Sequence, residues 1–186
     1  MHPANKWLVG LIPAALLSGA MLWEGKRNDP YLDLANILTV CYGHTGSDIQ
    51  RRRYSDKECE DFLQKDLIKH SQPVLECIHR PLSVQQYTAF VLMAFNIGTN
   101  AFCSSTTAKL FNEGKIEEAG RRIAYTPNGK PNWSYAGGKF VQGLHNRRVF
   151  EMNIYFKGAG DVSTLSEAGV YRCTPWWTVW RPPLSC

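Results

Sequence analysis

The sequence lacks the cysteine and histidine patterns that hold a metal ion. It has no CxxC pair and no His/Cys cluster at ligand spacing, so it does not favour a zinc site, and we expect no metal or cofactor. It also lacks internal repeats and low-complexity tracts, which excludes a repeat architecture. The 186 residues suit one domain with appendages, and 44% hydrophobic residues are enough for a globular core.

The cysteines do not by themselves indicate a compartment. Their even number is compatible with disulfides if the chain is exported, whereas a cytosolic chain would keep free thiols. Sequence alone does not select one of the 15 pairings that six cysteines allow. The six are Cys41, Cys59, Cys77, Cys103, Cys173 and Cys186.

Acidic residues are the minority among the charged ones. The sequence has 16 Asp and Glu and 21 Lys and Arg, for a formal net charge of +5. This balance favours an anionic partner such as nucleic acid, a lipid headgroup surface or the cell wall, and an ordinary basic solvated surface would give the same balance.

An apolar run near the N-terminus carries no charged residue, and it is short. Trp7 to Trp23 is 17 residues long, the lower limit for a helix that crosses a bilayer. Two tryptophans bracket it, as interfacial aromatics do. Lys6 precedes the run, and Lys26 and Arg27 follow it, so the flanking charges do not fix an orientation. Hydrophobicity and helix stability are lowered by Gly10, Pro13, Ser18 and Gly19.

Three interpretations of this run compete. It is a retained, weakly held signal anchor; or a cleavable signal peptide, with Ser18-Gly19-Ala20 as the small-x-small site; or a buried amphipathic or core helix. The first two place the chain after Trp23 outside the cytoplasm.

The next part of the chain predicts a small sheet and two helices. Residues 29–46 combine turn formers with β-branched and aromatic residues, which indicates a small hairpin or irregular sheet. Ser55 with Glu58 fits a capping box that opens a helix. Ser83 with Gln86 fits a second box before an apolar segment that predicts a buried central helix, and Gly98 is its expected stop.

Further helices follow. Residues 105–114 predict a short helix ended by Gly114, and residues 115–125 predict another. Residues 126–138 form a loop by composition, and helical spacing returns over 139–156. The fold class is therefore α+β, with a small strand-bearing lobe before a mostly helical lobe.

The tail from residue 158 has a different composition. Trp176, Trp177 and Trp180 stand among prolines and can form a binding face. Alternatively the tail lies over the domain, burying its rings and stapled through Cys173 and Cys186.

One pair of carboxylates has the chemistry of glycosidic bond cleavage. That reaction needs a proton donor and a second carboxylate, which attacks the sugar or activates water. Glu24 ends the apolar run, and Asp33 lies in the following turn region, an arrangement that can place them across a cleft. Thr39 can orient a water. Taken alone, these residues also fit ordinary surface positions.

The spacing of these residues resembles the signature of phage-type lysozymes, glycoside hydrolase family 24. Eight residues separate Glu24 from Asp33, five more precede Thr39, and "CYGHTG" follows. Further matches keep the family's order as far as residue 156: "AFNIGTNAF", "LFNEG" and "WSYAGGKFVQGLHNRR". The resemblance implies a lysozyme-like α+β fold, a small β-hairpin lobe and a mostly helical lobe preceded by an N-terminal apolar helix.

The resemblance also implies the activity. Glu24 would be the general acid, Asp33 the second carboxylate and Thr39 its helper, hydrolysing the bond between N-acetylmuramic acid and N-acetylglucosamine in peptidoglycan. We expect no nucleic-acid partner and a monomer. The alternatives are a lytic transglycosylase of related fold and a non-catalytic, membrane-anchored wall-binding protein.

A weak apolar run directly before the expected acid resembles the signal-arrest-release endolysins of this family. It implies three parts: an anchor over 1–23, a catalytic domain over 24–157 and a Trp/Pro-rich extension over 158–186. The enzyme would be exported, held at the periplasmic face of the host inner membrane through residues 7–23, and then released into the periplasm. Residues 1–23 contain no cysteine, so activation by refolding of the anchor is favoured over a thiol switch.

Other residues of these motifs have two interpretations each. His44 is a cleft-shaping residue that holds the hairpin, or a catalytic base. Asn96 contacts sugar or caps backbone. Arg147 and Arg148 are ion-pair or capping groups rather than ligands.

Overall fold

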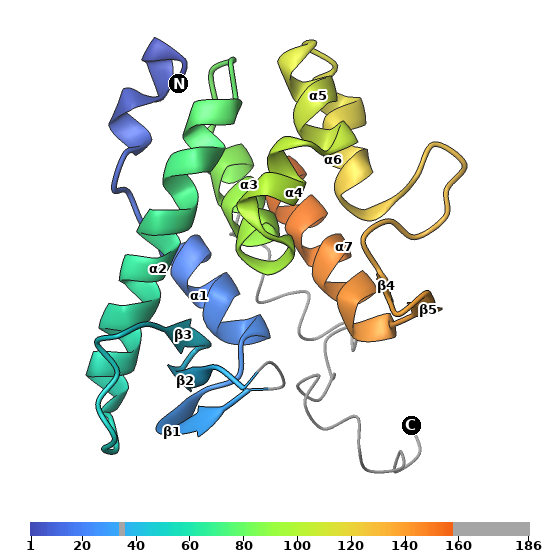
Figure 1. The fold of residues 1–186 in the computed structure, drawn as a ribbon. Helices are drawn as coiled ribbons and strands as arrows, with labels where there is room; N and C mark the ends of the chain where they lie inside the picture. The colour runs from blue at the N-terminus through green and yellow to red at the C-terminus, as the bar shows by residue number, and fades with distance from the viewer. Residues whose placement is uncertain (34–35, 158–186) are drawn as a thin grey trace.

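The computed structural model describes residues 1–33 and 36–157. Figure 1 shows a helical body with a three-stranded sheet at one end. The helices are η1 Pro3–Leu8, α1 Ala14–Trp23, α2 Asp56–Cys77, α3 Val84–Ile97, α4 Thr99–Cys103, α5 Thr106–Asn112, α6 Ile116–Ala124 and α7 Gln142–Lys157. The strands are β1 Arg27–Leu32, β2 Leu38–Cys41, β3 His44–Thr45, β4 Tyr135–Ala136 and β5 Lys139–Phe140.

The small sheet has the antiparallel order β1-β2-β3. Thr39 pairs with Tyr31 on one side and with Thr45 on the other. A disulfide joins Cys41 of β2 to Cys59 of α2, which fastens the sheet to the helical body. The predicted small, irregular sheet is confirmed, with its first strand starting at Arg27.

Both predicted capping boxes form. The Ser55 hydroxyl accepts from the backbone of Glu58, whose carboxylate accepts in return from Ser55, and Ser83 and Gln86 do the same at α3. Gly98 ends α3 with φ 89°. Gly114 follows α5 with φ 85°, and the N–H of Lys115 beyond it donates to Leu110, a Schellman ending.

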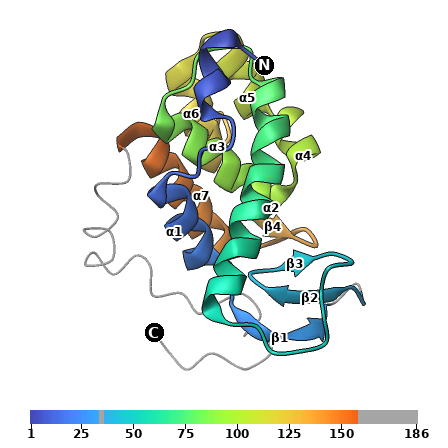
Figure 2. The ribbon, with the colours of Figure 1, turned by 90° about the vertical axis from the view of Figure 1, so that its left-hand side faces the viewer.

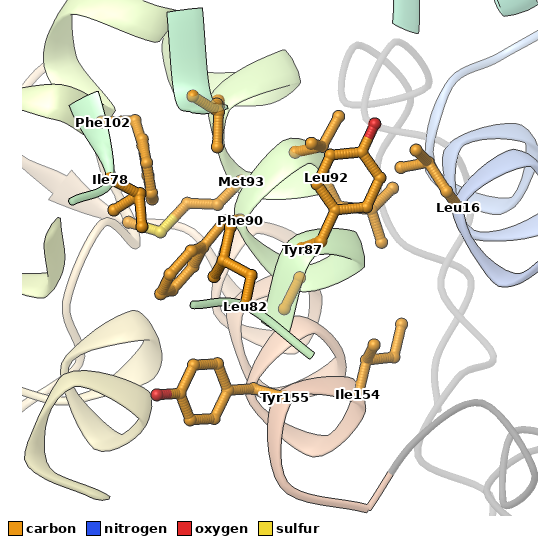
Figure 3. Close-up of a cluster of buried hydrophobic side chains, with 14 of the residues drawn as sticks. Leu16, Ile78, Leu82, Tyr87, Phe90, Leu92, Met93, Phe102, Ile154 and Tyr155 are labelled. Carbon is orange, nitrogen blue, oxygen red and sulfur yellow. The ribbon is translucent and has the colours of Figure 1, made fainter. Parts of the chain in front are cut away.

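Helix α3 is the centre of the core. Every residue from Tyr87 to Ala94 is buried. The Phe90 ring contacts Phe102, Phe111 and Tyr155 at centroid distances of 5.1, 5.2 and 5.5 Å, and Figure 3 shows this cluster around α3. Burying each large apolar side chain contributes about 1.5–3 kcal/mol. A second disulfide, Cys77–Cys103, links the ends of α2 and α4.

The apolar run does not form one helix. Its chain turns at Gly10, with φ 73°, and at Pro13, so η1 and α1 are separate elements. Leu8, Leu16 and Ala20 are fully buried in the main core, and α1 packs against α2 and α3 (Figures 1 and 2). Within residues 1–33 and 36–157, no helix is both long and apolar enough to cross a membrane.

One predicted loop contains regular structure. An isolated bridge pairs Tyr125, just before this loop, with Pro131 inside it. Strand β4 then pairs with β5 in a hairpin that continues to Phe140. Helix α7 accordingly starts at Gln142, three residues after the start of the helical spacing. The sequence pattern does not reveal this hairpin, because its two strands, joined by the Gly137-Gly138 turn, are only two residues long and are too short for a periodic pattern. Cys173, Cys186 and the three tryptophans of the tail lie outside the described residues.

Candidate active site

Glu24 is the residue that ends α1. Its backbone N–H donates to the carbonyl of Ala20 at 2.9 Å, and its own backbone is extended, so the chain leaves the helix there and enters the sheet. The carboxylate lies against α7, where Arg147 Nη1 donates to Glu24 Oε1 at 2.7 Å. Only 16% of the Glu24 side chain and 4% of the Arg147 side chain is exposed, so water screens this pair weakly.

Arg147 is itself held by a buried carboxylate. Its Nε donates to Glu151 Oε1 at 3.2 Å, and Arg148 Nη2 donates to the same oxygen at 2.7 Å. Burial raises the pKa of the Glu151 carboxyl, while the two guanidinium groups favour its ionised form. The Arg147 guanidinium therefore bridges Glu151 to Glu24, in agreement with the ion-pair interpretation of Arg147 and Arg148.

Asn96 contacts the same network. Its side-chain oxygen accepts from Arg148 Nη2 at 2.9 Å, and the residue is exposed. This contact is neither of the two roles expected for Asn96, although its exposure keeps it accessible to a sugar.

Asp33 and Thr39 meet at one residue of the turn between β1 and β2. Ile37 donates its N–H to Asp33 Oδ1 at 2.9 Å, and its carbonyl accepts from the backbone N–H of Asp33 at 3.0 Å. The hydroxyl of Thr39 donates to that same carbonyl at 3.0 Å. Thr39 is only 3% exposed, whereas Asp33 is half-buried. Hydrogen bonds to the backbone of Ile37 thus hold both Asp33 and Thr39.

Tyr31 connects the two candidate carboxylates electrostatically. Burial raises the pKa of the Tyr31 phenol, the Arg27 guanidinium 4.1 Å above its ring opposes this, and the negative charges of Asp33 and Glu24 both add to it. Tyr31 is therefore within electrostatic range of both carboxylates. No pattern in the sequence singles out Tyr31.

His44 lies outside this group. Its Nδ1 is 2.9 Å from Asp66 Oδ2, its Nε2 is 3.1 Å from Asp48 Oδ1, and its ring stacks on Phe62 at 4.1 Å. With both ring nitrogens bound, His44 fastens β3 to α2. Its contacts agree with the expected role of holding the hairpin.

Comparison with known proteins assigns this chain to a family. The phage lysozyme family matches residues 21–151. The SAR-endolysin of Escherichia phage Mu is 42% identical over 138 residues, covering 72% of this chain and 74% of that protein. The SAR-endolysin of Pseudomonas phage phiKMV is 31% identical over 163 residues, covering 87% and 98%.

A solved structure agrees with the sequence matches. The muramidase domain of SpmX from Asticaccaulis excentricus superposes with a TM-score of 0.69 at 26% identity, covering 79% of this chain and 98% of that one. The chain belongs to the phage lysozyme family. It is an endolysin with muramidase activity, a hydrolase that lyses the host cell.

Proposed function

We propose that Glu24 is the general acid of this muramidase, that Asp33 is the second carboxylate and that Thr39 assists Asp33. The observation that carries the assignment is the low exposure of Glu24 together with its contact to Arg147. A carboxyl group fixed at one oxygen has a defined direction for the other, which a proton donor requires.

In the proposed reaction each of these groups has one task. Glu24 gives its proton to the glycosidic oxygen as the bond to the sugar breaks, and the cationic sugar forms near Asp33. Asp33 stabilises this cation, by direct attack or by activating a water. Its backbone and Oδ1 are held by Ile37, and the Thr39 hydroxyl beside it can bind that water.

Product analysis tests this assignment. Mass spectrometry of muropeptides released from purified peptidoglycan should show hydrolysed, reducing ends. Asp33→Ala should lower kcat by about 100-fold or more, whereas Asp29→Ala, which removes an exposed carboxylate four residues earlier on β1, should change it little. Anhydro ends would assign the chain to the lytic transglycosylases instead.

We also propose that residues 1–23 are a weak membrane anchor before release, that 24–157 form the catalytic domain and that 158–186 form an extension. The names of the relatives support this, as do the length and low hydrophobicity of the run. The chain would be exported to the periplasmic face of the inner membrane and then freed into the periplasm. There it would act as a monomer on peptidoglycan.

In this proposal the described structure corresponds to the released enzyme. Leu8, Leu16 and Ala20 cannot lie in a bilayer and in the protein core at the same time. Asn5 also belongs to the folded body, because its amide donates to the carbonyl of Arg80 and accepts from the N–H of Leu82, both at 2.9 Å. Withdrawal of the run into the membrane would remove these contacts and displace Glu24, the next residue of the chain.

A further inference from the structure

Three exposed aromatic side chains stand on and beside the β4–β5 hairpin. Tyr135 is 51% exposed, Phe140 is 45% exposed and Trp133 is 36% exposed. Large aromatic rings bury much apolar area when they are covered, so a group of them left in water indicates a binding surface. We call these three residues the aromatic ridge.

The ridge has a defined shape. Tyr135 and Phe140 are cross-strand partners, and their ring centroids lie 5.8 Å apart at 69°. Gly137 and Gly138 make the two-residue turn between the strands, with φ of 55° and 76° that other residues rarely adopt. Trp133 also has a positive φ of 51°, a backbone conformation that costs of order 1–3 kcal/mol and that clusters at functional sites.

Contacts of Ser134 and His145 hold the hairpin in place. Ser134 is fully buried between the ridge residues, its carbonyl accepts from the N–H of Val141 at 2.9 Å, and its hydroxyl lies 3.3 Å from His145 Nδ1. The His145 ring also contacts Phe140 at 5.9 Å. The exposed rings are therefore presented by a supported element.

The ridge leads directly into α7, the helix that binds the proposed catalytic acid. Phe140 is followed after one residue by α7, and Arg147, which binds Glu24, lies five residues into that helix. At a rise of about 1.5 Å per residue this is roughly 7–8 Å along the axis. Figures 1 and 2 both place the hairpin at the end of α7 that lies toward the three-stranded sheet.

Along the chain on both sides of the ridge, the charged residues have one sign. From residue 119 to residue 150 the sequence contains no Asp or Glu. Lys130 and Lys139 are exposed in this stretch, and Lys139 sits on the hairpin itself. The surface therefore suits a ligand that combines flat apolar faces with negative charge.

We propose that the aromatic ridge, with Lys130 and Lys139, binds the glycan strand of peptidoglycan beyond the bond that is cut. The apolar faces of the sugar rings lie on Tyr135 and Phe140, and the lysines face carboxylates of the stem peptides. This inference rests on the proposed function in one respect: the position of the cleaved bond is taken from Glu24.

Surface variants test the ridge without disturbing the core. The ridge variant is Tyr135→Ser/Phe140→Ser, the charge variant is Lys130→Gln/Lys139→Gln, and the matched control is Ile68→Ser/Lys69→Gln on the exposed face of α2. Each full-length variant is compared for thermal midpoint, for hydrolysis of purified sacculi and, in a Glu24→Gln background in the cold, for co-sedimentation with sacculi.

We expect the ridge and charge variants to bind sacculi about five- to tenfold more weakly and to raise KM by a similar factor. Their kcat and thermal midpoints should match those of the control. Unchanged binding, a fall in kcat alone, or a dimer that only the ridge variant loses would overturn the proposal. If the Glu24→Gln protein still cleaved sacculi, the assignment of Glu24 as the acid would be refuted. The test of the ridge would still be valid, because it compares the initial binding of the ridge and control variants.

Discussion

Arg147 donates a hydrogen bond to Glu24 at 2.7 Å across 123 positions of sequence. It joins the end of the N-terminal helix to the last described helix. Glu151 accepts a hydrogen bond from the same guanidinium, so the position of the proposed acid depends on a buried charge network of α7.

Replacement of Arg147 tests the value of this contact. Arg147→Ala leaves Glu24 without its guanidinium partner, so kcat on sacculi should fall at least about tenfold while KM changes less than about twofold. Arg147→Lys should recover part of the rate because it restores the cation. Rates are measured well below the thermal midpoint, since breaking a buried ion pair also destabilises the fold by about 3–5 kcal/mol.

A matched control for this variant is Arg121→Ala. Arg121 forms an exposed pair with Glu117 on α6 at the same i,i+4 spacing that joins Arg147 to Glu151. Its loss should leave both kcat and the midpoint nearly unchanged. Equal kcat for Arg147→Ala and Arg121→Ala would show that Glu24 does not need its partner.

The capping box of α2 predicts a pH-dependent stability. The pKa of Glu58 is lowered from 4.5 to about 2, first by the hydrogen bond from Arg52 and then by the backbone and hydroxyl of Ser55. A lowered pKa stabilises the folded state above the unfolded value of 4.5, and this stabilisation is lost as pH falls toward about 2. Glu58→Gln should therefore be less stable than wild type near neutral pH, and the two should converge in acid.

Urea unfolding of both proteins over this pH range measures the difference. Because Glu58 is at the surface, the gap will be small. A gap that stays constant down to the lowest pH would mean that ionisation of Glu58 does not support α2.

The anchor proposal predicts that substitutions can strengthen membrane retention of the run without changing how α1 packs in the folded enzyme. Ala14 and Ser18 are exposed in the described structure, whereas Gly19 is packed so that an added Cβ would lie 3.0 Å from Leu92 Cδ1. Ala14→Leu/Ser18→Leu should raise the hydrophobicity of the run and delay release without disturbing the folded enzyme. Membrane fractionation over time, with timing of host lysis, measures this.

Two controls complete that experiment. The purified soluble form of the double variant should keep wild-type activity on sacculi, because neither side chain enters the core. The soluble wild-type protein should retain its N-terminus. A soluble form that begins at Met21 would show that the segment is a cleaved signal.

The sequence predicted the elements whose signals are local. Ser55 with Glu58, Ser83 with Gln86, and the two helix-ending glycines at 98 and 114 act within a few residues of themselves, and each forms as expected. The β4–β5 hairpin was not predicted: β4 falls in the predicted loop and β5 at the start of the predicted helix, because strands of two residues carry no clear pattern.

Contacts between distant segments were not predictable in this way. The spacing of Arg147 and Glu151 suits a helical ion pair, but nothing local shows that Glu24 completes it. The pairings Cys41–Cys59 and Cys77–Cys103 were likewise two among many combinations. The apolar run has the composition of a membrane segment as well as of a core helix, and its place in the core depends on the buried side chains of α2 and α3 against which it packs.

Glu24→Gln on purified sacculi tests the central claim most directly, with Glu117→Gln as the control at an exposed glutamate of α6. The amide keeps the size of the side chain and its oxygen can still accept from Arg147, so the fold should be retained while the proton is lost. We predict a fall of at least about 1000-fold in kcat for Glu24→Gln, as expected when a general acid is removed, and none for Glu117→Gln. Clearing by Glu24→Gln at the rate of wild type would contradict the account.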